Sequence, residues 1–259
     1  MEIQAMVKEA VQGYGQKELL TELKTFMQVG HHVNVLNLLG IVIGDMEHGE
    51  LFVITEYCRF GNLKDFLLKN RQFFRDEDDE DVTESVRLDL LSWSYQIANG
   101  LKHLASRDLV HGSLSARNVL LGEGNIVKLS NVAPYCRPQH CKLTPKNILS
   151  LERMAPECLQ DGGGTFTTSS DVWSFGVLLW ELFSLGSDPC WGMIPHGRLV
   201  DSFECVRRLP TPKHANEELY QLMRDCWKHD PQERPSFMEL CYSLHSMIPG
   251  KEVSKRYDL

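Results

Sequence analysis

The stretch HGSLSARNVLL, His111–Leu121, concentrates polar side chains that could take part in chemistry. It has the outline of a loop built for phosphoryl transfer, but Ser113 stands where that reaction needs a carboxylate. A serine hydroxyl has no basicity near neutral pH, so Ser113 cannot act as the general base. The loop is therefore predicted either to have lost its reaction or to be kept for another use.

The composition is that of a soluble globular domain. The chain has 259 residues, 42% of them hydrophobic and 24% charged, and its net charge of −8 argues against nucleic acid or anionic lipid as the main partner. No apolar run reaches membrane-spanning length and the N-terminus lacks a signal-peptide core, so we expect a cytoplasmic location and no direct membrane insertion. The eight cysteines include no Cys-x2-Cys pair, which argues against a zinc site and predicts reduced thiols.

Hydrophobic periodicity divides the chain into two unequal parts. Strands are predicted at 1–7, 35–43 and 50–57, and helices at 17–29, 62–68, 90–106, 169–184, 196–207, 217–228 and 236–247. The acidic run Asp76–Asp81 is predicted to be a solvated loop rather than a docking site for basic peptides. After the turn Gly162–Gly164, a Thr/Ser-rich stretch could cap the next helix. A small mixed lobe thus precedes a larger helical lobe, with the join near Cys58–Gly61.

Motifs along nearly the whole chain resemble the receptor tyrosine kinase family. They are TELKTFMQVGHHVNVLNLLG (21–40), VITEYCRFGNL (53–63), LVHGSLSARNVLL (109–121), RMAPE (153–157), DVWSFGVLLWELFSLG (171–186) and CWKHDPQERPSF (226–237). The resemblance implies an α+β, protein-kinase-like bilobal fold with an incomplete small β lobe and a large, mainly helical lobe. It divides the chain into a partial small lobe at 1–57, a hinge at 58–61, a large lobe at 62–250 with an acidic insert at about 70–86, and a tail at 251–259. Met1 would fall inside the third strand of the family, so the Gly-rich loop is expected to be absent.

The resemblance also implies where a nucleotide would bind. Thr55 takes the gatekeeper position, Glu56 and Cys58 lie in the hinge, and Leu120 would lie beneath an adenine ring. The family's third-strand lysine pairs with a glutamate of the following helix, here Glu22. Counting back from Glu22 without a gap, that lysine position falls on Ala5, or on Gln4 after a slip of one residue.

Lys8 is the nearest lysine to that position. It lies three residues beyond Ala5, and in a strand its side chain would point to the opposite face, so it is not expected to replace the missing lysine. Glu22 is then expected to be a solvated helix residue without its usual partner.

The remaining site positions separate into two groups. Ser113 replaces the catalytic aspartate of the His-Arg-Asp motif, and Asn131 replaces the metal-binding aspartate of Asp-Phe-Gly, while Asn118 keeps the second metal-ligand position. A hard dication prefers a carboxylate to the neutral amide oxygen of Asn131. The positions with a structural role match the family: His111, Glu157, Asp171 and Arg234.

Three hypotheses follow from this pattern. The first is a pseudokinase, the intracellular part of a receptor at the plasma membrane, which acts as a scaffold or allosteric partner of an active kinase or receptor signalling complex. The second is an ATP-dependent protein tyrosine kinase with unusual chemistry, and the third is a truncated product without a stable role. ATP and magnesium are possible cofactors by resemblance, and their binding is predicted to be weak or absent.

Overall fold

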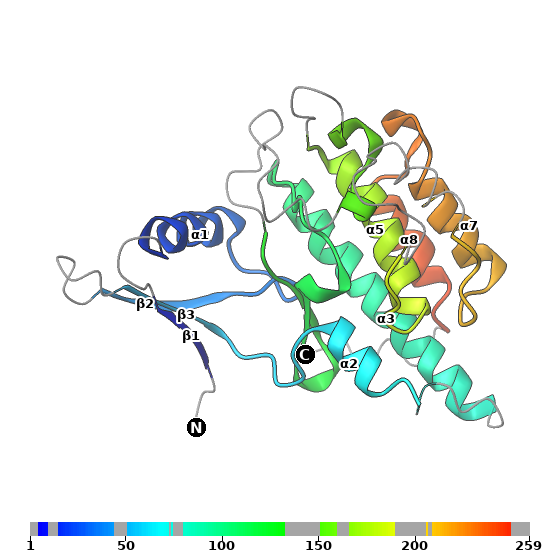
Figure 1. Ribbon diagram of the computed structural model, residues 1–259, viewed down its shortest axis with the longest axis horizontal. Coiled ribbons are helices and arrows are strands. Elements are labelled where there is room, and N and C mark those ends of the chain that lie inside the picture. Colours follow the sequence, from blue (N-terminus) through cyan, green and yellow to red (C-terminus); the bar gives the residue numbers. More distant parts are fainter. Residues whose placement is uncertain are drawn as a thin grey trace.

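The computed structural model describes residues 5–9, 15–43, 51–72, 74, 80–132, 151–159, 166–189, 206 and 209–249. These residues form a small sheet with one helix and a larger group of helices (Figure 1). The predicted α+β fold with a small sheet-containing lobe and a larger helical lobe is confirmed.

The small lobe is a three-stranded antiparallel sheet covered by one helix. Strands β1 (Ala5–Glu9), β2 (Leu38–Ile43) and β3 (Leu51–Glu56) are arranged in the order β1-β3-β2, with a bulge in β2 between Leu38 and Gly40. Side chains along β3 alternate between buried and partly buried, which is the pattern of a strand with one face on a core. Helix α1 (Gly15–Val29) covers that face, and Leu19 packs with Leu51 and Val53.

Helix α2 (Leu63–Lys69) follows the turn between the lobes and begins at a good N-cap. The Asn62 side chain accepts a hydrogen bond of 2.9 Å from the backbone N–H of Asp65, which satisfies one of the free donors of the first turn. The backbone of Phe60 and Gly61 in turn bonds to Leu121, so the turn is fixed to the floor of the large lobe.

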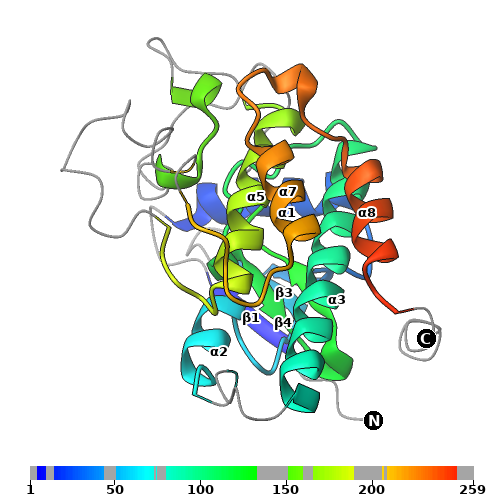
Figure 2. The same cartoon turned by 90° about the vertical axis from the view of Figure 1, so that its right-hand side faces the viewer.

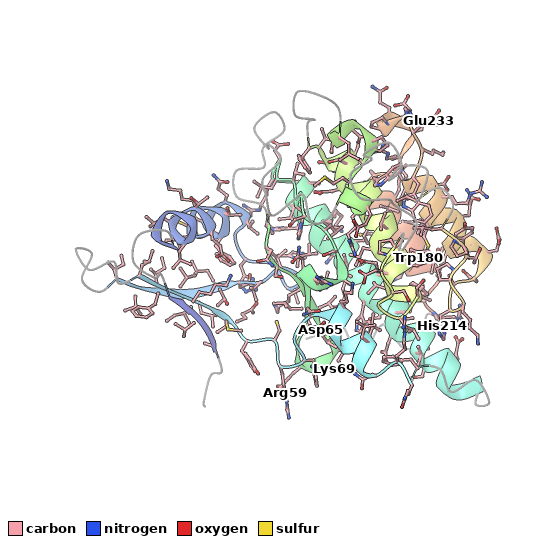
Figure 3. The ribbon with its side chains drawn as sticks, viewed as in Figure 1. Arg59, Asp65, Lys69, Trp180, His214 and Glu233 are labelled. Carbon is pink, nitrogen blue, oxygen red and sulfur yellow. The ribbon has the colours of Figure 1, made fainter. Side chains whose placement is uncertain are left out.

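The large lobe is organised around a nearly fully buried helix, α5 (Thr168–Phe183). Thr167 and Ser170 form a capping box at its start, as predicted for the Thr/Ser-rich stretch. Around it lie α3 (Glu80–Ala105), α7 (Glu217–Cys226) and α8 (Phe237–Ser246) (Figure 2). Trp180 of α5 lies among these helices and donates its indole N–H to the Pro210 carbonyl at 2.8 Å (Figure 3).

Short elements position the loops that matter for function. A two-stranded antiparallel sheet, β4 (Val119–Leu121) and β5 (Val127–Leu129), lies between the two lobes. The single-turn helices are η2 (Ala116–Asn118), η3 (Glu123–Asn125), η4 (Leu151–Arg153), η5 (Pro156–Leu159) and η6 (Pro231–Glu233). At Gly100 of α3, a Cβ atom would lie 2.8 Å from the backbone oxygen of Asn34, so glycine allows α3 to approach the loop after α1.

The element predictions are correct in type for the described residues, with one exception. Helix α3 begins at Glu80, well before the predicted helix at 90–106, so the end of the predicted acidic loop and the last part of the predicted insert at about 70–86 are helical. The segment 80–86 carries few apolar residues, so hydrophobic periodicity gives no signal for a helix there. The rest of that run, the predicted helix at 196–207 apart from Val206, the turn Gly162–Gly164 and the tail 251–259 lie outside the described residues.

Candidate functional site: a kinase-like cleft without its carboxylates

Asp171 of α5 holds the start of the loop at His111 through two backbone hydrogen bonds. The two carboxylate oxygens of Asp171 accept the backbone N–H groups of His111 at 2.6 Å and Gly112 at 2.9 Å. Asp171 is buried, and this burial raises the pKa of its carboxyl to about 7, although both hydrogen bonds act to lower it. His111 is fully buried as well, and burial lowers the pKa of its imidazole to about 4. The predicted structural role of both residues therefore has a direct physical basis.

The three positions that would carry the chemistry are hydrogen-bonded to one another. The Ser113 hydroxyl donates to the backbone carbonyl of Asn131 at 3.0 Å, and the Asn131 side-chain amide donates to Oδ1 of Asn118 at 2.9 Å. The Asn118 side-chain amide donates to the backbone carbonyl of Ser113 at 2.6 Å. We call this closed set of three bonds the Ser113–Asn118–Asn131 ring.

The ring determines which atoms face one another. Nδ2 of Asn118 donates to the Ser113 carbonyl, so Oδ1 of Asn118 faces Asn131. Because this oxygen can only accept, the Asn131 side chain contacts it through its amide N–H group. Asn131 adopts φ 55, in the left-handed region that asparagine tolerates better than most residues. Both side chains are thus held in a neutral contact that a cation would have to break.

The ring does not fit the magnesium ion that the family uses. Magnesium is usually held by one or two carboxylates together with the substrate phosphates. Here the Asn131 position offers a donor to Asn118, and the base position offers the neutral Ser113. No group of three or more metal-ligating side chains is found in the described ranges of the chain.

The prediction for the third-strand lysine is wrong. Nζ of Lys8 lies 2.5 Å from Oε1 of Glu22, so the strand and the helix are joined by an ion pair and Glu22 has a partner. Ala5 does lie on the opposite face, as its spacing requires, and its register neighbour is Glu56. Gap-free counting failed because it assumed a fixed length for the connection between β1 and α1, which surface loops do not keep. The lysine position of the family belongs to Lys8.

The predicted nucleotide-binding positions Thr55 and Glu56 lie at the C-terminal end of β3. Thr55 is 1% exposed, and its hydroxyl has no hydrogen-bond partner within the described part of the chain. The Glu56 carboxylate turns away to accept from Asn37 at 3.0 Å and to pair with Lys128 at 2.9 Å.

Two further predicted positions lie in the turn between the lobes and on the strand beside it. Cys58 is buried, which raises the pKa of its thiol. Leu120 lies next to Asn62 through an isolated bridge, at the base of the hinge. Arg59 in the same turn lies at the lower edge of the molecule, and its exposed guanidinium pairs with Glu123 at 3.3 Å (Figure 3).

The predicted anchor of the large lobe is present. The Arg234 guanidinium donates to both carboxylate oxygens of Glu157, at 2.6 and 2.9 Å, and its side chain is fully buried. It also donates to the Ser169 carbonyl at 2.9 Å and lies over the Trp173 ring, 5.1 Å from the centroid. A planar donor with this many partners holds residues far apart in sequence in one geometry.

One charged cluster was not recognised in the sequence. Arg153 donates to Oε1 of Glu181 at 2.6 and 3.0 Å, and Oε2 of Glu181 accepts the backbone N–H of Ala116 at 2.9 Å. Glu181 is fully buried, so this pair connects α5, the end of the segment at 151–153 and the loop below the ring. The signal was available, because a single acid inside the apolar run VLLWELF requires a buried partner.

Comparison with known proteins agrees with this architecture. A family model described as protein tyrosine and serine/threonine kinase matches residues 1–244. The chain belongs to this family. The kinase-like domain is 34% identical to vascular endothelial growth factor receptor 1 of Gallus gallus over 94% of its own length, and 38% identical to a fibroblast growth factor receptor of Halocynthia roretzi over 89%.

The domain corresponds to only part of those proteins. It spans about a fifth of the first receptor, 22%, and about a third of the second, 32%. In the described part of the domain, no helix is both long enough and apolar enough to cross a membrane. The domain is thus tyrosine-kinase-like and similar to the kinase portions of receptors.

Proposed function

We propose that this domain is a pseudokinase, which acts as a scaffold or allosteric partner and transfers little or no phosphate. The observation that carries the proposal is the Ser113–Asn118–Asn131 ring. Its members stand at the base position and at both metal positions of the family, and each is held in a neutral hydrogen bond. On this proposal, the general base and a metal-binding carboxylate are both missing from the ring.

The loss at the base position alone has a large expected effect. A positioned acid–base group typically contributes about 10²–10⁴-fold to a rate. The Ser113 hydroxyl donates a hydrogen bond to the backbone carbonyl of Asn131 and has no basic form near neutral pH, so it supplies none of this factor. The loss of the metal-binding carboxylate adds to it, although such effects need not multiply.

The groups that shape the domain support a role in binding. Asp171, Arg234 and Glu157 keep the contacts that fix the loops of the large lobe. A rigid kinase-shaped surface is what an active kinase or a receptor signalling complex could recognise. By analogy with the receptors that it resembles, we propose that the domain is the intracellular part of a receptor at the plasma membrane.

A phosphotransfer assay tests the proposal directly. The purified domain is incubated with radiolabelled ATP, magnesium or manganese, and a tyrosine-containing polymer. We expect incorporation at the level of the matched variant Lys8→Met, in which the ion pair with Glu22 is removed. Incorporation by the unmodified chain that depends on Lys8 would overturn the proposal.

The ion pair between Lys8 and Glu22 favours a second candidate, a tyrosine kinase of low activity. In active kinases the same pair must be in place for phosphoryl transfer. This candidate needs another group in place of the general base. Among the described residues, the hydrogen-bond partners of the Ser113 hydroxyl are the Asn131 carbonyl and the Asn118 amide, and neither is basic. The assay above separates the two candidates, because only the second predicts transfer that is lost with Lys8.

A further inference from the structure

The small lobe exposes much of its apolar surface. Its core cluster consists of Leu19, Leu51 and Val53, whereas most of the exposed large apolar side chains in the described part of the chain lie between positions 6 and 43. Apolar side chains that gather on one part of a surface mark sites of association. The small lobe is therefore the part of the domain that would gain most from a partner that covers it.

Strand β2 contributes the densest part of this surface. Its exposed apolar side chains are Leu39, Ile41, Val42 and Ile43. Ile41 is in register with Val53 of β3, so Ile41 and Ile43 lie on the face of the sheet that α1 covers, yet Ile43 is 64% exposed (Figure 1). Val42 lies on the opposite face and is 49% exposed. A partner that covers both faces of β2 at once must lie beside the strand rather than over one face of the sheet.

The outer edge of β2 is open to such a partner. In the strand order β1-β3-β2, the strand β2 pairs with β3 on one side, and no other strand of the described residues pairs with it. A bulge disrupts its start between Leu38 and Gly40, but Gly40–Ile43 pairs residue for residue with β3. Charged side chains normally protect an edge strand from pairing, and β1 at the other edge carries Lys8 and Glu9. The regular part of β2 has no charged residue, so it is the less protected edge.

The sequence of β2 is complementary to itself. The segment Ile41-Val42-Ile43 reads the same in both directions, and two antiparallel strands meet with their directions reversed. A two-fold axis at Val42 sets Ile41 of one copy opposite Ile43 of the other, and the two Val42 side chains opposite each other. Pairs of β-branched side chains stabilise neighbouring strands, and no like charges meet in this pairing. A second copy of the chain is therefore the partner that this edge fits.

We propose that two copies of this domain associate through the outer edges of β2, antiparallel and about a two-fold axis at Val42. The contact joins the two three-stranded sheets into one. Because both copies use the same edge, the association closes at a dimer. A standard stable interface takes about 20–30 residues from each side, and this edge offers far fewer, so the dimer separates on dilution. The inference goes beyond the proposed function and does not depend on it.

Sedimentation velocity of the domain tests the inference. We expect the unmodified domain to shift from monomer to dimer as its concentration rises from about 1 to about 200 μM. Ile43→Lys should raise the dissociation constant of the dimer by about tenfold or more, because it places a charge beside Ile41 of the other copy. The matched control is Val7→Lys, which adds the same charge at an exposed β-branched residue of β1, the other edge of the sheet. It should leave the dissociation constant unchanged.

Disulfide cross-linking tests the position of the axis. In an antiparallel pair, the Cα atoms of directly opposite residues are about 4.5–5.5 Å apart, within the range of about 4.4–6.8 Å that a disulfide spans. The variant Val42→Cys should therefore form a covalent dimer in oxidised glutathione, seen on a non-reducing gel. Val7→Cys is the control, because it has the same number of cysteines and places its added thiol at the exposed position of the other edge.

Each of the following results would overturn the inference while leaving the proposed function in place. They are a monomer at every concentration, oligomers larger than a dimer, equal effects of Ile43→Lys and Val7→Lys, and cross-linking of Val42→Cys no faster than that of Val7→Cys. The three substituted positions are exposed, so the variants should melt like the unmodified domain and any change in association is not a folding defect. Phosphotransfer by the unmodified domain would overturn the proposed function alone.

Discussion

The side-chain amide of Asn131 donates a hydrogen bond of 2.9 Å to the side-chain oxygen of Asn118. By resemblance these residues correspond to the two metal-binding positions of the kinase family, and here they contact each other through neutral groups. The Asn118 amide N–H group donates to the Ser113 carbonyl, so Asn118 keeps its oxygen, and not its N–H group, directed at Asn131. Asn131 thus presents a hydrogen-bond donor at a position where the kinase family has the acceptor oxygens of an aspartate.

We expect the single substitution Asn131→Asp to create a divalent cation site. The carboxylate removes the donor and places oxygens beside Oδ1 of Asn118, a pairing that a cation stabilises. Thermal unfolding with and without manganese should show a rise in Tm for this variant and none for the unmodified protein. Asn131→Ala is the control, because it breaks the ring without supplying a ligand; a shift in the control equal to that of Asn131→Asp would contradict the prediction.

Two restored carboxylates should raise phosphotransfer above the level of the unmodified domain. Because Lys8 already pairs with Glu22, the double variant Ser113→Asp, Asn131→Asp is expected to exceed the unmodified domain by about 10²-fold or more in a radiolabel assay. Adding Ala5→Lys should bring no further gain, since Ala5 faces the other side of the strand. A gain that appears only with Ala5→Lys would restore the assignment of the lysine position to Ala5.

Arg153→Met should destabilise the domain through the charge that it leaves behind. Glu181 is fully buried and would lose its partner, which costs about 3–5 kcal/mol in comparable pairs. The double variant Arg153→Met, Glu181→Gln should recover most of that loss, because glutamine is neutral and can still accept the Ala116 N–H. Urea unfolding of the four proteins of this cycle gives the coupling energy. Additive losses in the double variant would argue against an uncompensated charge.

Arg234→Met should cost about 3–5 kcal/mol of unfolding free energy, because it leaves Glu157 and several carbonyl groups without their donor. The matched control is Arg224→Met, because Arg224 is an exposed arginine of α7. This substitution should change the free energy of unfolding by no more than about 0.5 kcal/mol. Both are measured by urea unfolding. Similar losses in the two variants would mean that the ion pair does not anchor the lobe.

The stability of the domain should fall below pH 6.5 in part because of His32. Its ring stacks on His103 at 4.5 Å, and its Nδ1 accepts the Asn34 N–H at 3.1 Å. Burial, and then the cations nearby, lowers the pKa of His32 from 6.5 to about 4. The unfolded chain therefore takes up the proton first as the pH falls, so the stabilising contribution is complete above pH 6.5 and is lost as the pH falls toward about 4.

The variant His32→Asn isolates this effect, since it keeps a neutral acceptor that does not titrate. As the pH falls from about 7 to about 5, the unmodified domain should lose more unfolding free energy than the His32→Asn variant. Asp171 acts with the opposite sign, because its raised pKa of about 7 removes stability as the pH rises, but it is present in both proteins and cancels. Parallel pH curves would show that His32 does not titrate in this range.

The sequence was sufficient for the overall fold and for the missing carboxylates. Periodicity alone separated a small mixed lobe from a helical one, because the apolar face of each element must be buried locally. Ser113 and Asn131 are not carboxylates, and the resemblance to the kinase family is what assigns their positions to the general base and to a metal ligand. Such statements depend on residue type and need no spatial information.

Only the tertiary structure decided which partners these residues have. Lys8 pairs with Glu22 across a connection whose length no periodic pattern determines, so counting from Glu22 assigned the lysine position to Ala5. The ring joins Ser113 and Asn118 to Asn131 because β5 returns beside β4, and a hydrogen bond between distant residues depends on that return. Residue types determine what a site cannot do, whereas the distances between side chains decide how their polar groups are satisfied instead.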